Sequence, residues 1–194
     1  MRIPRNVAAR ALSCCVLIAA PVFSMAQAAP AKPAVGSAQL PSMVYGKQLG
    51  ALERAFVSAA EAMPEDKFDF APPATAGEFK GVRTFGEQVK HVADANYFFF
   101  NSTGTSDADL KAKGDAIMKL KTKAEIVAAL KDSFVQAHAY VNGITPENAF
   151  LETATGGTRA GMTSFGLAHL MDHYGQMVVY LRMNSIVPPA SRSN

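Results

Sequence analysis

The chain has 194 residues, a formal net charge of +3 and a hydrophobic content of 49%. This length fits a single domain. The charge is nearly balanced, and after the first 28 residues no basic stripe of the kind typical of nucleic-acid-binding proteins remains. Its only cysteines, Cys14 and Cys15, lie close to the N-terminus, so the rest of the chain has to fold without disulfides.

Residues 1–28 are typical of a secretory signal peptide. Arginines precede an apolar run at residues 11–23, and Ala26-Gln27-Ala28 fits a cleavage site. The run is too short, and too interrupted by Pro21, to span a bilayer comfortably, so an uncleaved membrane anchor is the weaker alternative. The two cysteines lie inside the run instead of just after it, which argues against a lipoprotein. We therefore expect an exported protein, periplasmic or secreted, without stable membrane insertion after cleavage.

Cleavage after residue 28 would remove three arginines and no acidic residue, leaving sixteen basic and sixteen acidic side chains. The mature net charge is then near zero, and no nucleic-acid partner is expected. Residues 29–41 are rich in Ala and Pro and are predicted to form a flexible linker. Residues 42–194 are predicted to form one domain.

Four segments repeat apolar residues every three or four positions, which predicts amphipathic helices. They span about residues 43–63, 83–101, 123–142 and 163–183. The last is apolar nearly all round, as is typical of a central helix. A short extra helix is expected within residues 110–120, and no segment predicts a strand. The predicted fold is therefore all-α, a four-helix bundle.

His169 and His173 are four residues apart, so both imidazoles leave one face of the last helix. Such a pair is common by chance, and histidines satisfied within the core are the simple alternative. No Glu follows His169, which excludes the metalloprotease motif. His91, midway along the second helix, is a candidate third ligand. Three neutral imidazoles leave one coordination position open, as in catalytic metal sites.

Other polar residues have weaker claims to a site. His138, on the third helix, is interpreted as a packed or partly exposed residue and as the replacement should another histidine prove exposed. Candidates to support a ligand or contact a substrate are Gln176, Asp172, Asp94 and Glu87. Gln176 shares the histidine stripe and is the best of them, whereas a solvated role is favoured for the carboxylates. Packing roles are favoured for Tyr97 and Tyr174.

Several of these segments resemble the DinB superfamily. They are His91-Val-Ala-Asp-Ala-Asn-Tyr-Phe98, His169-Leu-Met-Asp-His-Tyr-Gly-Gln176 with its continuation to Pro189, and Met63-Pro-Glu-Asp-Lys-Phe-Asp-Phe-Ala-Pro72. The resemblance implies a four-helix bundle in which His91, His169 and His173 bind a divalent metal ion. It also implies a homodimer as the common assembly. Members with an assigned reaction include thiol-dependent transferases, but an exported chain would not meet the cytoplasmic thiol pool.

The function expected from the sequence is a metal-dependent hydrolase or transferase acting on a small molecule, with zinc or nickel as the metal. The alternative is a non-catalytic exported metal-binding protein or a helical interaction module. Because protonated imidazole cannot bind a metal, occupancy is expected to fall below the ordinary histidine pKa of about 6.5.

Overall fold

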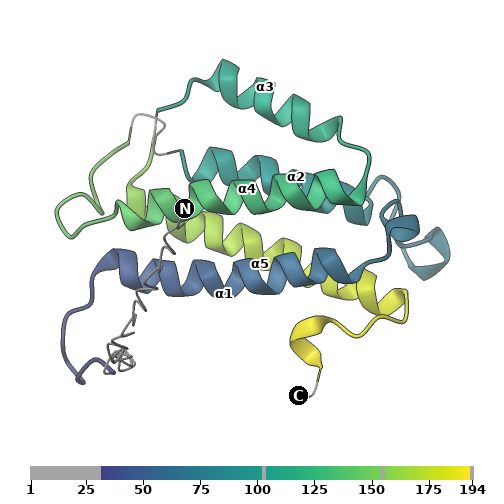
Figure 1. The fold of residues 1–194 in the computed structure, drawn as a ribbon, viewed down its shortest axis with the longest axis horizontal. Coiled ribbons are helices and arrows are strands. Elements are labelled where there is room, and N and C mark those ends of the chain that lie inside the picture. Colours follow the sequence, from purple (N-terminus) through teal and green to yellow (C-terminus); the bar gives the residue numbers. More distant parts are fainter. Residues whose placement is uncertain (1–31, 102–103, 154–155, 193–194) are drawn as a thin grey trace, which may run out of the picture. The chain divides into compact units, whose positions relative to one another are not determined.

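Five α-helices build the domain in the computed structural model, which describes residues 32–101, 104–153 and 156–192 (Figure 1). Residues 38–194 form one unit, and the predicted signal peptide lies outside the described residues. The α-helices are α1 (Pro41–Ala62), α2 (Phe85–Phe99), α3 (Asp107–Met118), α4 (Lys123–Asn142) and α5 (Arg159–Met183). Three short 3-10 turns accompany them: η1 (Glu65–Lys67), η2 (Ala74–Ala76) and η3 (Pro189–Ser191).

Helices α1, α2, α4 and α5 form a closed bundle. Both α1 and α2 pack against α4 and against α5, so each helix of the bundle has two neighbours. Helix α3 packs mainly against α2, on the outside of the bundle. Within the described residues the only β pairing is the isolated bridge between Glu152 and Thr158. The all-α prediction is therefore confirmed, and α3, which overlaps the short extra helix expected within residues 110–120, lies outside the four-helix bundle.

Hydrogen-bonded caps explain where two of the helices begin. Thr84 accepts a hydrogen bond from the Glu87 backbone, and the Glu87 carboxylate accepts one from the Thr84 backbone. Thr122 and Glu125 form the same capping box before α4. Each box satisfies backbone N–H groups that have no partner inside the helix.

The last helix differs from its prediction in two ways. It begins at Arg159, four residues before the expected Thr163, because Thr158 caps it by accepting a hydrogen bond from the Gly161 backbone. It is also not central. One side of α5 is exposed and carries large apolar side chains, with Phe165 at 65% and Val179 at 50% exposure. The apolar composition of this segment therefore wrongly predicted a central helix that is buried on all sides.

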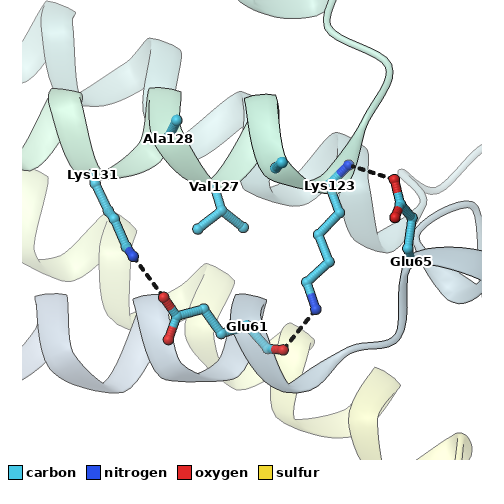
Figure 2. A pocket seen from close by; sticks show the side chains of 7 residues that line it. Glu61, Glu65, Lys123, Val127, Ala128 and Lys131 are labelled. Atoms are coloured by element: carbon cyan, nitrogen blue, oxygen red, sulfur yellow. Dashed lines mark hydrogen bonds and ion pairs between the residues drawn. The ribbon is translucent and has the colours of Figure 1, made fainter.

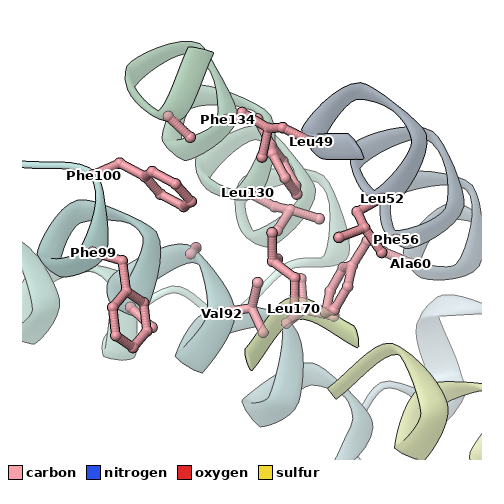
Figure 3. Close-up of a cluster of buried hydrophobic side chains, with 14 of the residues drawn as sticks. Leu49, Leu52, Phe56, Ala60, Val92, Phe99, Phe100, Leu130, Phe134 and Leu170 are labelled. Carbon is pink, nitrogen blue, oxygen red and sulfur yellow. The ribbon is translucent and has the colours of Figure 1, made fainter. Parts of the chain in front are cut away.

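The core lies between the four bundle helices (Figure 3). Phe56 of α1, Phe134 of α4 and Leu170 of α5 are completely buried, and so is Val92 of α2. Burying one such side chain contributes about 1.5–3 kcal/mol. Because all four helices contribute, displacing any of them would expose part of this cluster.

A charged seam joins the end of α1 to the start of α4 (Figure 2). The Lys123 ammonium donates to the backbone carbonyls of Glu61 and Met63 at 2.7 Å each, and Lys131 pairs with the Glu61 carboxylate at 2.6 Å. The seam lines a surface hollow of about 340 Å³. Its charged groups bind one another and close the helix ends, so its role is structural.

Residues 32–40 of the predicted linker contain no helix or strand and are exposed, and α1 begins at Pro41, two residues before the predicted start. In the described part of the chain, none of the helices combines the length and the apolarity that crossing a bilayer requires.

Two glycines of α5 give a matched test of how closely α2 and α5 approach. A Cβ at Gly166 would lie 2.8 Å from the Phe100 ring, whereas a Cβ at Gly175 would meet nothing within 4 Å. We expect Gly166→Ala to be less stable than Gly175→Ala by about 1–3 kcal/mol, because overpacking outweighs the gain in helix propensity. Urea unfolding measures the difference; equal stabilities would show that the contact is slack.

Candidate metal centre

Two helices supply the three predicted ligands. His91 lies in the middle of α2, while His169 and His173 lie one turn apart on α5. His173 is only 6% exposed, and the other two are half-buried. The closeness of α2 and α5 therefore brings together side chains that are 78 residues apart in sequence.

The three imidazoles converge through their Nε2 atoms. His169 Nε2 lies 3.1 Å from His91 Nε2 and 3.1 Å from His173 Nε2. One ligand atom from each histidine lies within 4.8 Å of the other two. Tetrahedral zinc bonds of about 2.0–2.1 Å would hold nitrogen ligands roughly 3.3 Å apart. The spacing therefore fits three ligands of one ion.

Hydrogen bonding alone does not satisfy this cluster. His169 Nε2 carries either one proton or one lone pair, so it cannot make two full hydrogen bonds of one kind to its neighbours. A shared cation would accept all three lone pairs at once. The buried Nδ1 of His169 has no hydrogen-bond partner within the described residues. The donor set and its geometry therefore fit a divalent ion that prefers imidazole.

His173 is held from behind by a chain of polar side chains. Its Nδ1 lies 2.7 Å from Gln88 Oε1. Gln88 Nε2 donates to Gln176 Oε1 at 2.7 Å, and Gln176 Nε2 donates to Asp172 Oδ2 at 3.0 Å. Gln176 and Asp172, both candidates from the sequence, thus reach the cluster through Gln88. Asp172 is exposed, as expected, but it is engaged with Gln176.

Burial keeps the three imidazoles neutral. It is the main reason that the pKa values of His91, His169 and His173 are each lowered to about 4. The positive charge of Arg83 lowers all three further, while Asp172 opposes the shift at His169 and His173. Neutral imidazole is the form that binds a metal. The lowered pKa values therefore move the expected loss of metal in acid to a lower pH than the ordinary histidine pKa of about 6.5 implies.

A pocket of about 510 Å³ opens beside the cluster, between α2, α3 and α5. His91 and His169 lie in its lining, with Phe98 and Leu110 as apolar walls. Asp94 also lines it and makes no hydrogen bond or ion pair within the described residues, while burial, and then Asp115, raises the pKa of its carboxyl. Asp94, predicted to be solvated, thus faces space that a small molecule could fill.

The remaining candidates lie outside the cluster. His138 Nε2 pairs with the Glu53 carboxylate at 2.7 Å, in agreement with the partly exposed role expected for it. Glu87 completes the cap of α2. Tyr97 is buried in the core beneath the Lys113 ammonium, and Tyr174 packs against that core, which fits the packing role favoured for both.

Sequence reasoning missed Gln88, which is 2% exposed. It precedes His91 by three residues, so both side chains leave the same face of α2. A glutamine beside the apolar stripe of Val89 and Val92, at that spacing from a candidate ligand, was the available signal.

These features define an all-α protein with a three-histidine cluster that could hold a metal ion. A family model of the DinB superfamily matches residues 48–177, which is more than half of the chain. The chain therefore belongs to the DinB superfamily, a metal-binding family with a helical-bundle fold. No curated protein matches the chain.

The lowered histidine pKa values predict how the metal-free protein responds to acid. In the unfolded chain these histidines titrate near 6.5, but in the folded chain near 4, so the unfolded state binds more protons between these values. Stability is therefore expected to fall as pH drops from about 6.5 to about 4. Urea unfolding at several pH values measures this, and His173→Gln should lessen the dependence. If His173→Gln leaves the slope of stability against pH unchanged, the lowered pKa of His173 is contradicted.

Proposed function

We propose that this protein is an exported metal-dependent enzyme, a hydrolase or transferase acting on a small molecule. The observation that supports this most directly is the convergence of three Nε2 atoms at the edge of the 510 Å³ pocket. Three protein ligands leave a coordination position open, as catalytic metal sites do. In this proposal His91, His169 and His173 are the ligands, and the ion is zinc or nickel, because both suit imidazole.

A bound ion would supply Lewis acidity and lower the pKa of a bound water or thiol. The chain supplies the rest. The Phe99 ring, with its centroid 5.1 Å from that of His169, shields one side of the cluster from water. Phe98 and Leu110 offer apolar surface to a substrate. The unpaired Asp94 carboxylate can accept a proton or a hydrogen bond from a molecule in the pocket.

The alternative function is a metal-binding or interaction module without catalysis. The exposed apolar side of α5, which includes Phe165, Met171 and Val179, favours a protein partner in either case. Metal removal distinguishes the two: a structural ion should contribute much of the thermal stability, whereas an open catalytic site should contribute less. The pocket beside the histidines favours the catalytic alternative.

Metal content is the direct test. The purified protein is expected to hold one divalent ion per chain, measured by mass spectrometry of the metal. His91→Ala, His169→Ala and His173→Ala should each weaken binding by more than about 100-fold, beyond the roughly 10–100-fold effect of residues that only support a ligand. Because burial keeps the imidazoles neutral, occupancy should persist to about pH 5.

His138→Ala is the matched control, because His138 pairs with Glu53 away from the cluster. It should leave the metal content unchanged. Equal occupancy in the wild type and in all three ligand variants would exclude the metal site. Turnover of a small ester such as p-nitrophenyl acetate, lost on metal removal and slowed by Asp94→Asn without metal loss, would support catalysis. Absence of turnover together with a large fall in melting temperature would favour the structural alternative.

We also propose that residues 1–28 are removed on export, that residues 29–41 form a linker, and that the mature protein is a homodimer. The exposed side of α5 supports the dimer, because its apolar side chains would be buried by a second copy. Native mass spectrometry of the protein secreted from the full chain should give twice the mass of a chain beginning at Ala29. A monomeric mass would contradict the proposed dimer, and a mass that still includes residues 1–28 would contradict the proposed cleavage.

A further inference from the structure

The hydrogen-bond chain behind His173 has a direction, which begins at Asp172. An ionised carboxylate only accepts hydrogen bonds, so Gln176 must present Nε2 to Asp172, 3.0 Å away. The Oε1 of Gln176 then faces Gln88, which must donate through its own Nε2 at 2.7 Å. The remaining Oε1 of Gln88 lies 2.7 Å from Nδ1 of His173. An amide oxygen only accepts, so this Nδ1 carries the proton.

We propose that Asp172, acting through Gln176 and Gln88, fixes His173 in the tautomer that carries its proton on Nδ1. The lone pair then lies on Nε2, which points at His169 Nε2 and the centre of the cluster. The proposal deepens the proposed function, because it explains how one ligand is prepared for the metal. All three residues are positioning residues, since none of them reaches the cluster except through His173.

Burial makes this constraint effective. Gln88 is 2% exposed and His173 6%, so water cannot easily replace the hydrogen bond between them. The reversed chain would put the proton of His173 on Nε2, where it would point into the cluster and prevent ligation. Of the two α5 histidines, His173 alone is preset in this way, because Nδ1 of His169 has no partner in the described residues.

The first test reverses the hydrogen-bond chain by a substitution at Asp172, its solvent-exposed end. In Asp172→Lys the ammonium can only donate, so Gln176 and then Gln88 should turn round and place the His173 proton on Nε2. Long-range ¹H–¹⁵N NMR of the metal-free full chain reads the tautomer directly. We expect Nδ1–H in the wild type and a majority of Nε2–H in the variant, with zinc affinity lowered by about tenfold or more.

Two substitutions at the buried end complete the test. Gln88→Leu removes the acceptor, so the two tautomers of His173 should become mixed and zinc affinity should fall by roughly 10–100-fold. Gln88→Glu keeps an acceptor for Nδ1–H and should restore both the tautomer and most of the affinity. If Gln88 only filled space, Gln88→Leu would already keep most of the zinc affinity, because leucine and glutamate fill a similar volume. Gln88→Glu would then have nothing to restore.

Two controls distinguish the effect of the hydrogen-bond chain on His173 from the effect of a changed surface charge and from the effect of removing a glutamine elsewhere. Asp132→Lys makes the same change of charge at an exposed position of α4, outside the exposed side of α5, and should leave the tautomer unchanged, with zinc affinity within about threefold. Gln136→Leu removes a glutamine that donates to the Phe100 carbonyl instead, and should change neither quantity.

The proposal is overturned if metal-free wild type holds His173 as Nε2–H, or if Asp172→Lys leaves the tautomer as it is. Asp172 is exposed, so this variant stays informative even if Gln88→Leu fails to fold. If the protein binds zinc but Asp172→Lys leaves the tautomer of His173 unchanged, the role of the hydrogen-bond chain is disproved and the proposed function is not affected. If the wild type binds no zinc, the proposed function is disproved, while the spectrum of the metal-free protein still tests the hydrogen-bond chain.

Discussion

The close approach of α2 and α5 is the constraint on which this site depends. A metal bond has a nearly fixed length, so ligands from two helices must be placed to within a few tenths of an ångström. Here the crossing is set by Gly166, which leaves room for the Phe99 and Phe100 end of α2. The same approach closes the core around Leu170 and brings Gln88 to His173. Packing and ligand geometry are thus aspects of one contact.

Much of the fold could be predicted because local signals agree with the tertiary structure. Helix α4 has the predicted bounds, Lys123–Asn142, since a capping box precedes it and Gly143 follows it. The apolar stripes of α1 and α2 face the core as expected. The pairing of His169 with His173 follows from helix geometry alone. His91 could be named only as a candidate third ligand from its place on a bundle helix. Periodicity says nothing about which helices are neighbours, so the expectation that all three histidines bind one ion depended on the family resemblance as well.

What could not be predicted depends on neighbours that are distant in sequence. The start of α5 was missed because Gly156, Gly157 and Gly161 suggest a loop, although Thr158 caps a helix there. The exposed side of α5 could not be distinguished from a buried one by composition. The role of Gln88 depends on Gln176, 88 residues away. The lowered histidine pKa values come from burial, which a sequence does not report directly.

The pocket and the histidine cluster are formed by partly different helices, and α3 contributes to the pocket alone. It supplies Leu110 and Lys111 to the pocket wall, yet its only buried residues are Gly114 and Ile117, and it packs mainly on α2. The histidines and the residues behind His173 belong to α2 and α5 alone. Substitutions on α3 can therefore reshape what the cavity admits while leaving the histidine cluster untouched. Such a partition lets one scaffold change the molecules that its pocket accommodates by altering a peripheral element.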